Sequence, residues 1–322
     1  MRIDNCIDLF MDGFYTKEIN CIDIPMAACC SIYSRDNYFF YVFLLIMSWN
    51  FLNNSDDWLY VRKRIISVLY GKLYEETSES VEDTFNTIVN ALKNNNLVLC
   101  IFKYGALPYS RYYRTGTYDH GVIICGIDEE KEIFKIADRE LIRQYIDEGI
   151  FTADVVATQW ISFAMLKQII LESEHMFCDN NDNMTEHYRK TYIIENSMKA
   201  IGWREIKAEV CEMIKSNFHN GIREFIKNMN TADYLAKANM QSNRRKYYLS
   251  LEAMTRILTK YSENDRMVQD IWKRFLDNRH FLIDKIYKSI YANDSCDNLE
   301  EFLSLDEQLA FEFFDVLGES NG

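Results

Sequence analysis

The stretch His120–Asp138, HGVIICGIDEEKEIFKIAD, decides the fold. Apolar, β-branched and aromatic residues fill Gly121–Ile127 and Glu132–Ala137, and the polar run Asp128–Lys131 separates them. Two such runs joined by a short polar turn are typical of a β-hairpin. The hairpin begins after a histidine and ends at an aspartate, so both of its outer ends carry side chains that can move or hold a proton.

His120 and Asp138 face each other directly if the turn contains three or five residues. The numbers of ladder partners then add up to 258, as 120 and 138 do, and Val122 and Ile124 fall on the same side as His120. Directly opposed Cβ atoms lie about 5 Å apart, so the imidazole and the carboxylate can hydrogen-bond. Such a bond selects one tautomer and leaves the other ring nitrogen to act as a base. A four-residue turn would instead place Arg139 opposite His120.

Cys21 is the candidate nucleophile for this base. It comes just before Asp23–Tyr33, a predicted helix for which Asp23 is the candidate N-cap. The unpaired N–H groups at a helix start favour a thiolate, and they can also stabilise the oxyanion of an acyl transfer. Cys29 and Cys30 are rival nucleophiles, but packing explains a cysteine in the middle of a helix more simply.

Each of these residues also has a structural interpretation. Taken alone, His120 could be a structural histidine at a strand end, Asp138 a turn residue and Cys21 a small buried hydrophobe. A cysteine before a helix together with a histidine opposite an aspartate is the pattern that a nucleophilic site requires. On the residues alone, both interpretations stay open.

The rest of the chain mixes helical and strand patterns up to about Ser197 and is almost wholly helical from Met198. The spacing of apolar residues predicts helices over Tyr38–Phe51 and Val81–Asn94, and strands over Leu97–Phe102, Val155–Phe163 and Tyr188–Glu195. Further helices are predicted near Trp203–Lys215, Gly221–Met229, Arg245–Thr259, Asp265–Ala292 and Ser304–Leu317. We therefore expect an α+β domain over 1–197 that carries the site, followed by a helical region over 198–322.

Composition narrows the class of protein. The net charge is -13, and an acidic surface repels phosphate backbones, so nucleic acid is not an expected partner. The nine cysteines show no metal-ligand spacing, which predicts a reduced, cytoplasmic protein without a metal. Since Tyr38–Phe51, the most apolar stretch, is too short to span a bilayer, we expect no membrane segment. Neither a GxGxxG motif nor a Walker loop is present, so no nucleotide cofactor is expected.

The order of Cys21, His120 and Asp138, with Asp138 18 residues after His120, resembles that of papain-like enzymes. The resemblance is closer to the BtrH-like family, whose members are similar to cysteine proteases and serve antibiotic and other secondary-metabolite pathways. Three blocks within about half of the chain carry it, namely Asn20-Cys21 followed by Arg35–Tyr38, Leu107–Tyr109 with Tyr113, and His120–Asp128 ending at Ala137-Asp138.

This resemblance implies a fold and a reaction. The fold would be the papain-like cysteine protease fold, with helices packed on an antiparallel sheet and an all-helical C-terminal extension. Cys21, His120 and Asp138 would be nucleophile, base and orienting residue of an amide-forming acyltransferase. The enzyme would take an acyl group from a carrier-protein thioester and deliver it to a small amine, diaminopropane being one candidate. The product would be a nonribosomal natural product such as closthioamide. No cofactor is expected, because phosphopantetheine arrives on the carrier protein.

Partner and substrate contacts follow from the same resemblance. An acidic carrier protein needs a basic docking patch, although the ordinary interpretation of each basic cluster is a solvated face. The candidate clusters are Arg111 with Arg114, Arg62–Arg64 and Arg244–Lys246. The aromatic loop Tyr104–Tyr113 could line an acyl pocket or simply anchor itself by packing. The candidate substrate-binding residues are Tyr109, Arg111, Tyr113 and Arg114.

Two points stay open at this stage. Papain-like proteases place a glutamine shortly before the nucleophile, whereas Phe14–Asn20 contains none, so the oxyanion donor is unassigned between Asn20 and backbone groups. The alternatives to acyl transfer are a cysteine peptidase or amidase, which passes the acyl group to water, and a noncatalytic binding module of the same fold.

Overall fold

The computed structural model describes residues 1–9, 21–48, 58–142, 144, 157–176, 189–195, 197–206, 252, 254–262, 265–292 and 299–319. These residues fall into two compact units. The first takes in the described residues of Ile19–Tyr41 and Arg62–Ala200 together with the N-terminal strand, and the second those of Val42–Val61 and Ile201–Gly322.

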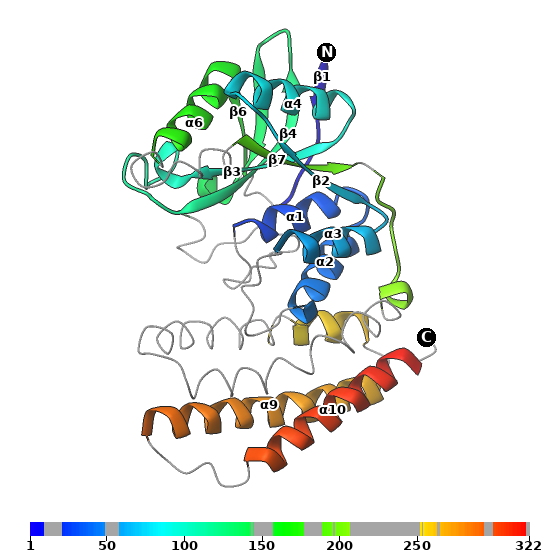
Figure 1. Ribbon diagram of the computed structural model, residues 1–322. Coiled ribbons are helices and arrows are strands. Elements are labelled where there is room, and N and C mark those ends of the chain that lie inside the picture. The colour runs from blue at the N-terminus through cyan, green and yellow to red at the C-terminus, as the bar shows by residue number, and fades with distance from the viewer. Residues whose placement is uncertain are drawn as a thin grey trace. The chain divides into compact units, whose positions relative to one another are not determined.

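The first unit is built on one antiparallel sheet (Figure 1). Its strands in the described part of the chain are β1 Arg2–Asp4, β2 Lys72–Thr77, β3 Leu97–Lys103, β4 Asp119–Asp128, β5 Ile133–Ala137, β6 Thr158–Ser162 and β7 Lys190–Glu195. They follow the spatial order β2-β7-β3-β4-β5-β6, and β1 pairs with β4. The expected α+β class is thereby confirmed, since helices pack on a sheet whose strand pairs are antiparallel.

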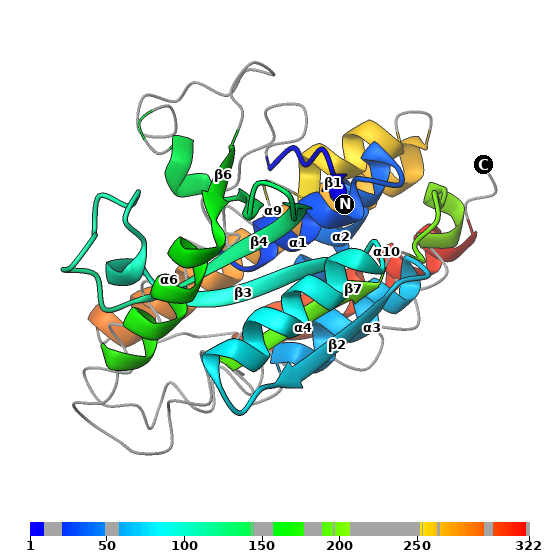
Figure 2. The same ribbon diagram turned by 90° about the horizontal axis from the view of Figure 1, so that it is seen from above.

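Helices α4 and α6 cover one face of this sheet, and α1 lies on the other (Figures 1 and 2). The helices are α1 Asp23–Cys30, α2 Arg35–Ser48, α3 Trp58–Val68, α4 Val81–Lys93 and α6 Phe163–His175, with short 3-10 turns η2 Tyr104–Ala106 and η3 Arg139–Ile142. Ser80 caps α4 by accepting the N–H of Asp83 at 3.1 Å, and the buried apolar residues of α4 pack against the strands. Burial of this apolar face stabilises the helix on the sheet.

The β4–β5 hairpin has a different register from the expected one. Ile124 pairs with Ile136, and, after an extra residue at Cys125, Gly126 pairs with Lys135. The partner numbers therefore add up to 260 before this β-bulge and 261 after it, so the direct pairing of His120 with Asp138 was wrong. Because the shift from 258 to 260 is even, the residues between His120 and the bulge keep their expected faces.

Helix α1 is anchored by a buried ion pair rather than by a side-chain cap. Ile22 is the N-cap residue and makes no side-chain cap bond, so the cap expected at Asp23 is wrong. Asp23 instead accepts two hydrogen bonds from Arg62, at 2.8 and 2.6 Å, and a third from the hydroxyl of Tyr41 at 2.9 Å. Since α1 follows Cys21 directly, this ion pair helps to hold the candidate nucleophile in place.

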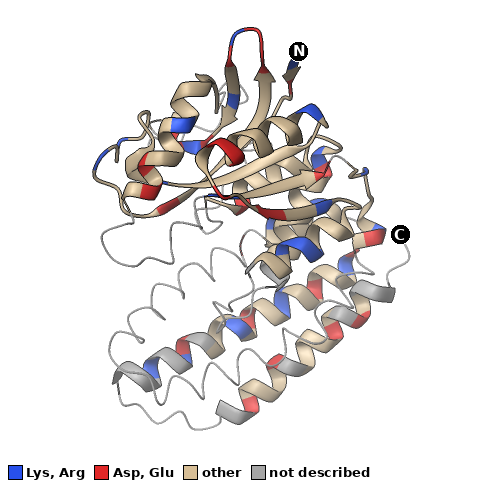
Figure 3. Ribbon diagram, turned by 45° about the horizontal axis from the view of Figure 1, so that its top comes forward, with Lys and Arg blue, Asp and Glu red and all other residues tan. Residues whose placement is uncertain are grey.

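The second unit contains a pair of long helices, α9 Arg266–Ala292 and α10 Leu299–Glu319. Trp272 packs against Phe313 with ring centroids 5.0 Å apart, and Arg279 forms a buried ion pair with Asp306. Charged residues of both signs are interleaved along α9, whereas the charged residues of α10 are all acidic (Figure 3). The predictions over Asp265–Ala292 and Ser304–Leu317 are confirmed, whereas Gly221–Met229 and most of the other two predicted helices lie outside the described residues.

Within the described ranges, no helix combines the length and the apolar character that crossing a membrane requires.

Candidate active site

His120 is the second residue of β4 and pairs with Phe102 of β3. Alternation along β4 places its side chain on the same face as Val122 and Ile124. The residue is fully buried, as is Asp138, and its Nε2 lies 2.6 Å from Oδ1 of Asp138. The expected contact between the two side chains is therefore present, although it is not a contact between ladder partners.

Asp138 lies one residue past β5, where the chain turns into η3. Its own N–H donates to the carbonyl of Ala157 at 2.9 Å, and its Oδ1 also accepts the N–H of Glu140 at 2.9 Å. Its Oδ2 accepts the hydroxyl of Tyr109 at 2.9 Å. Burial raises the pKa of this carboxyl, but the charge of His120 and these bonds outweigh burial and keep the pKa below its usual value. The carboxylate is thus held ionised and in one orientation.

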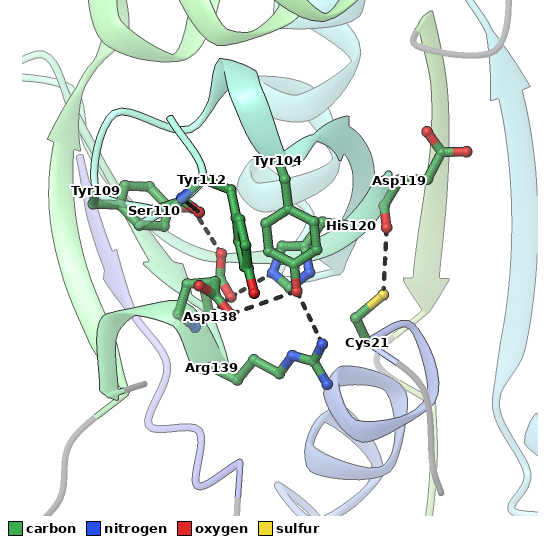
Figure 4. A network of polar contacts seen from close by, with 10 residues as sticks. Cys21, Tyr104, Tyr109, Ser110, Tyr112, Asp119, His120, Asp138 and Arg139 are labelled. Carbon is green, nitrogen blue, oxygen red and sulfur yellow. Dashed lines mark hydrogen bonds and ion pairs between the residues drawn. The ribbon is translucent and has the colours of Figure 1, made fainter. Parts of the chain in front are cut away.

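His120 lies between Asp138 and Cys21, with its Nδ1 on the side of Cys21 (Figure 4). Nδ1 is buried and has no hydrogen-bond partner among the residues that the structure describes. The thiol of Cys21 lies against the start of β4, with Sγ 3.7 Å from the carbonyl oxygen of Asp119. This arrangement gives the imidazole one nitrogen for the carboxylate and one for the sulfur, which is what a general base for a thiol needs.

Gly121 allows the backbone of Cys21 to approach β4 closely. A Cβ at Gly121 would lie 2.7 Å from the carbonyl oxygen of Cys21 and 3.2 Å from Cα of Ile22. Both are backbone atoms, so neither can move aside without shifting the start of α1. This role of Gly121 was not expected from the sequence. A glycine directly after the candidate base was the available signal.

The electrostatics of the site favour a thiolate beside an imidazolium. Burial raises the pKa of Cys21. His120, the N–H of Gly121 and the charge of Arg139 together lower it by more than burial raises it, so the net pKa is below the ordinary value. Burial lowers the pKa of His120, while Asp138 and Cys21 raise it, to about 9. Cys21 is half-buried and thus open to a substrate.

The rival cysteines lie in a different environment. Cys29 and Cys30 are fully buried in α1. Burial raises the pKa of both thiols well above the ordinary value, and a protonated, inaccessible thiol is a poor nucleophile. Their interpretation as packing residues agrees with this placement.

Tyr104, expected only as part of an aromatic loop that could line an acyl pocket, and Arg139, for which no role was expected, both belong to the site. The ring of Tyr104 covers that of His120 with centroids 4.2 Å apart and an angle of 31° between the planes. Arg139 donates from Nη2 to the hydroxyl of Tyr104 at 2.9 Å. No sequence signal pointed to this contact, because Tyr104 and Arg139 are brought together only by the sheet.

The candidate substrate-binding residues separate into two groups. Tyr109 is half-buried and donates its hydroxyl to Asp138, so it supports the carboxylate. Arg111 is exposed and lies over the ring of Tyr112 at 4.9 Å, and the exposed Arg114 lies over that of Tyr113 at 5.1 Å.

The two other basic clusters give no surface docking patch that the structure describes in full. Arg62 is buried against Asp23, so it is not part of a surface docking patch. Arg244–Lys246 lies outside the described residues, as does Phe14–Asn20, where an oxyanion donor was sought. In the part of the chain that the structure describes, no group of three or more His, Cys, Asp or Glu side chains could hold a metal ion.

Comparison with known proteins found no matching family model and no matching curated protein. The geometry around Cys21 and His120 therefore has to carry the functional conclusion.

Proposed function

We propose that this chain is a cysteine-dependent acyltransferase that forms an amide through an acyl-cysteine intermediate. The observation that carries the proposal is the arrangement of His120, with one ring nitrogen held by Asp138 at 2.6 Å and the other on the side of the half-buried Cys21. The proposed fold is papain-like, with a helical C-terminal extension. The antiparallel sheet with α1 on the face opposite α4 and α6 supports it.

The first step transfers the acyl group to the enzyme. The Cys21 thiolate attacks the thioester carbonyl carbon of an acyl carrier protein or peptidyl carrier protein, forming a new C–S bond. Collapse of the tetrahedral intermediate breaks the original C–S bond, and the departing thiolate takes a proton from His120. The raised pKa of His120, about 9, supports this step because it keeps a proton on the ring at neutral pH.

The second step transfers the acyl group to an amine. His120, now neutral, accepts a proton from the amine as its nitrogen attacks the acyl-Cys21 carbonyl, and Cys21 leaves as a thiolate. The products are an amide and the resting pair of thiolate and imidazolium. Atoms and charge balance without ATP or a further cofactor. The carrier-protein donor and a small diamine acceptor rest on the resemblance of the sequence to BtrH-like enzymes.

Intact-protein mass spectrometry tests the proposal. The enzyme is mixed with a carrier protein loaded with an acyl thioester, with and without a small diamine, and wild type is compared with Cys21→Ala. Cys6→Ala is the matched control, because Cys6 is exposed and lies outside the site. We expect an acyl adduct on wild type and Cys6→Ala but none on Cys21→Ala, and we expect the diamine to release it as an amide.

The other outcomes reject the proposal in distinct ways. Release of the adduct only as free acid would make the chain a cysteine hydrolase. An adduct that persists in Cys21→Ala would move the nucleophile to another cysteine. No adduct from any carrier thioester or peptide ester, with no selective alkylation of Cys21, would leave a binding module.

A further inference from the structure

The three residues that follow β5 all act on the surroundings of one imidazole. Asp138 bonds the edge of the His120 ring, and the backbone N–H of Glu140 fixes that carboxylate at 2.9 Å. Tyr104 covers the face of the ring, and its hydroxyl accepts a hydrogen bond from Arg139 at 2.9 Å. The same hydroxyl lies 3.5 Å from Oε1 of Glu140. The start of η3 therefore secures the imidazole both at its edge and across its face.

Arg139 has a second relationship, with the nucleophile. Its guanidinium extends from η3 toward the start of α1, on the same side of Tyr104 as Cys21 (Figure 4). Arg139 is half-buried, so solvent screens its charge only in part. Its positive charge lowers the pKa of Cys21, as does His120.

We propose that Arg139 is a positioning residue of the site, which holds the His120 ring in place through Tyr104 and stabilises the Cys21 thiolate by its charge. The inference rests on the proposed function only in taking Cys21 as the nucleophile. On this inference, the hydrogen bond between Arg139 and Tyr104 positions the site in addition to stabilising the fold. The bond ties the guanidinium to the hydroxyl of the ring that covers the imidazole.

The other charges around the Cys21 thiol allow the effect of Arg139 on its pKa to be measured separately. The titratable and charged groups on the elements around Cys21 are His120 and Asp119 of β4, Lys103 of β3, Tyr104 of η2, Asp138 after β5, Arg139 and Glu140 of η3, Asp23 of α1 and Arg62 of α3. Lys103 is bonded to Asp119 at 2.9 Å and Arg62 to Asp23 at 2.6 Å, so these charges are paired within themselves. Substituting Arg139 removes a positive charge that lowers the pKa of Cys21.

The experiment measures the apparent pKa of Cys21 from the pH dependence of its alkylation by iodoacetamide. Mass mapping of the Cys21 peptide separates it from the other cysteines. The variants are Arg139→Met, Arg139→Lys and Tyr104→Phe. The matched control is Arg274→Met, which removes one positive charge from an exposed arginine of α9 paired with Glu312 at 3.2 Å. Circular dichroism checks that each variant folds.

We expect Arg139→Met to raise the apparent pKa of Cys21 by about half a unit to one unit, which lowers the alkylation rate by roughly three- to tenfold at pH values below the wild-type pKa of Cys21. Arg139→Lys, which keeps the charge, should recover most of the loss. Tyr104→Phe, which keeps the ring but removes the bond that holds Arg139, should give a smaller rise.

An unchanged pKa in Arg139→Met, equal to that of Arg274→Met, would overturn the inference. If Arg139→Met does not fold, an unchanged pKa in Tyr104→Phe overturns it instead. The assay contains no acyl donor. A shifted pKa of Cys21 in Arg139→Met, with no acyl transfer by wild type, would therefore reject the proposed function and keep this inference. Normal acyl transfer by wild type, with an unshifted pKa in Arg139→Met, would keep the proposed function and reject this inference.

Discussion

Nε2 of His120 lies 2.6 Å from Oδ1 of Asp138, and the two residues sit diagonally rather than directly across the β4–β5 ladder. Diagonal neighbours on one face of a sheet are close enough for an aromatic side chain to bridge them. The carboxylate is steadied by the N–H of Glu140 and the hydroxyl of Tyr109, so it can hold the ring without being its ladder partner.

The pH dependence of the alkylation rate of Cys21 should reveal an ion pair between its thiolate and the imidazolium of His120. The pKa of Cys21 is lowered and that of His120 is raised to about 9, so thiolate and imidazolium coexist between the two values. We expect alkylation of Cys21 to begin at a lower pH than that of an ordinary thiol and to fall as acid protonates the thiolate. Acyl transfer should also fall above about pH 9, where His120 loses the proton that the leaving thiol needs. An alkylation rate that begins to rise only near pH 9.0, the ordinary thiol pKa, would contradict the pair.

Asp138→Asn should lower the pKa of His120, because burial then acts without the opposing carboxylate. In wild type, stabilisation from the raised pKa of His120 is complete below the ordinary pKa of 6.5 and is lost as the pH rises through about 9. Stabilisation from the lowered pKa of Asp138 is present above 3.8 and is lost as the pH falls through its folded pKa. The free energy of unfolding of the variant should therefore lack both of these pH-dependent contributions.

Two measurements check the Asp138→Asn prediction. Titration of the His120 ring by NMR gives its pKa, and urea unfolding at several pH values gives the free energy of unfolding. We also expect acyl transfer to fall by roughly 10²–10⁴-fold, since an amide does not stabilise the imidazolium. A His120 pKa that stays near 9 in the variant would show that Asp138 does not control it.

Tyr109→Phe should weaken the site without unfolding it. The substitution removes the 2.9 Å hydrogen bond to Oδ2 of Asp138 and keeps the ring. We expect unfolding to become easier by about 1–2 kcal/mol, because the lost bond is to a charged group that is itself buried. The pKa of Asp138 should rise and the pKa of His120 should fall with it. If stability and the His120 titration match wild type, the hydroxyl is dispensable. Tyr113→Phe is the control, as this half-buried tyrosine belongs to the same loop.

Gly121→Ala should displace the nucleophile. The new Cβ would lie 2.7 Å from the carbonyl oxygen of Cys21, so the start of α1 has to move away from β4. A misplacement of about 1 Å costs on the order of 10²-fold in rate. Gly202→Ala is the control, since its nearest neighbour is Oε2 of Glu205 at 2.9 Å, the end of an exposed side chain. Wild-type alkylation and acyl-adduct rates in Gly121→Ala would show that the site tolerates the methyl group.

Asp23→Ala should destabilise the first unit strongly. It leaves Arg62 buried without the carboxylate that it bonds at 2.6 and 2.8 Å, and breaking a buried pair costs about 3–5 kcal/mol. Urea unfolding measures the loss. The double variant Asp23→Leu with Arg62→Met removes both charges and should recover much of it. A double variant as unstable as Asp23→Ala would mean that shape rather than charge sets the cost.

Local sequence patterns predicted many of the elements that build the site. The apolar runs of β3, β4 and β5 mark strands whose faces are buried, and the spacing of Phe85 and Ile88 marks α4 as amphipathic. Strand β2 was not predicted, because its sequence KLYEET is largely polar and exposed at the edge of the sheet. Its strand character comes from pairing with β7.

Contacts between distant residues could not be read from local patterns. Arg62 looked like part of a basic surface cluster, yet it is buried because its partner Asp23 lies on another helix. Tyr104 and Arg139 carry no local sign that one holds the other. Such pairs depend on how strands and helices come together.

The sequence by itself determined that His120 and Asp138 end the two arms of one hairpin, since alternation and a polar turn are local properties. Only the tertiary structure decided that they meet. Four residues separate the paired Asp128 and Ile133, and an unbroken ladder from that turn would put Asp138 opposite Ile123, on the face that His120 does not share. The extra residue at Cys125 shifts the register by one and returns Asp138 to the face of His120. A bulge depends on the twist and packing of the whole sheet, so no local pattern announces it.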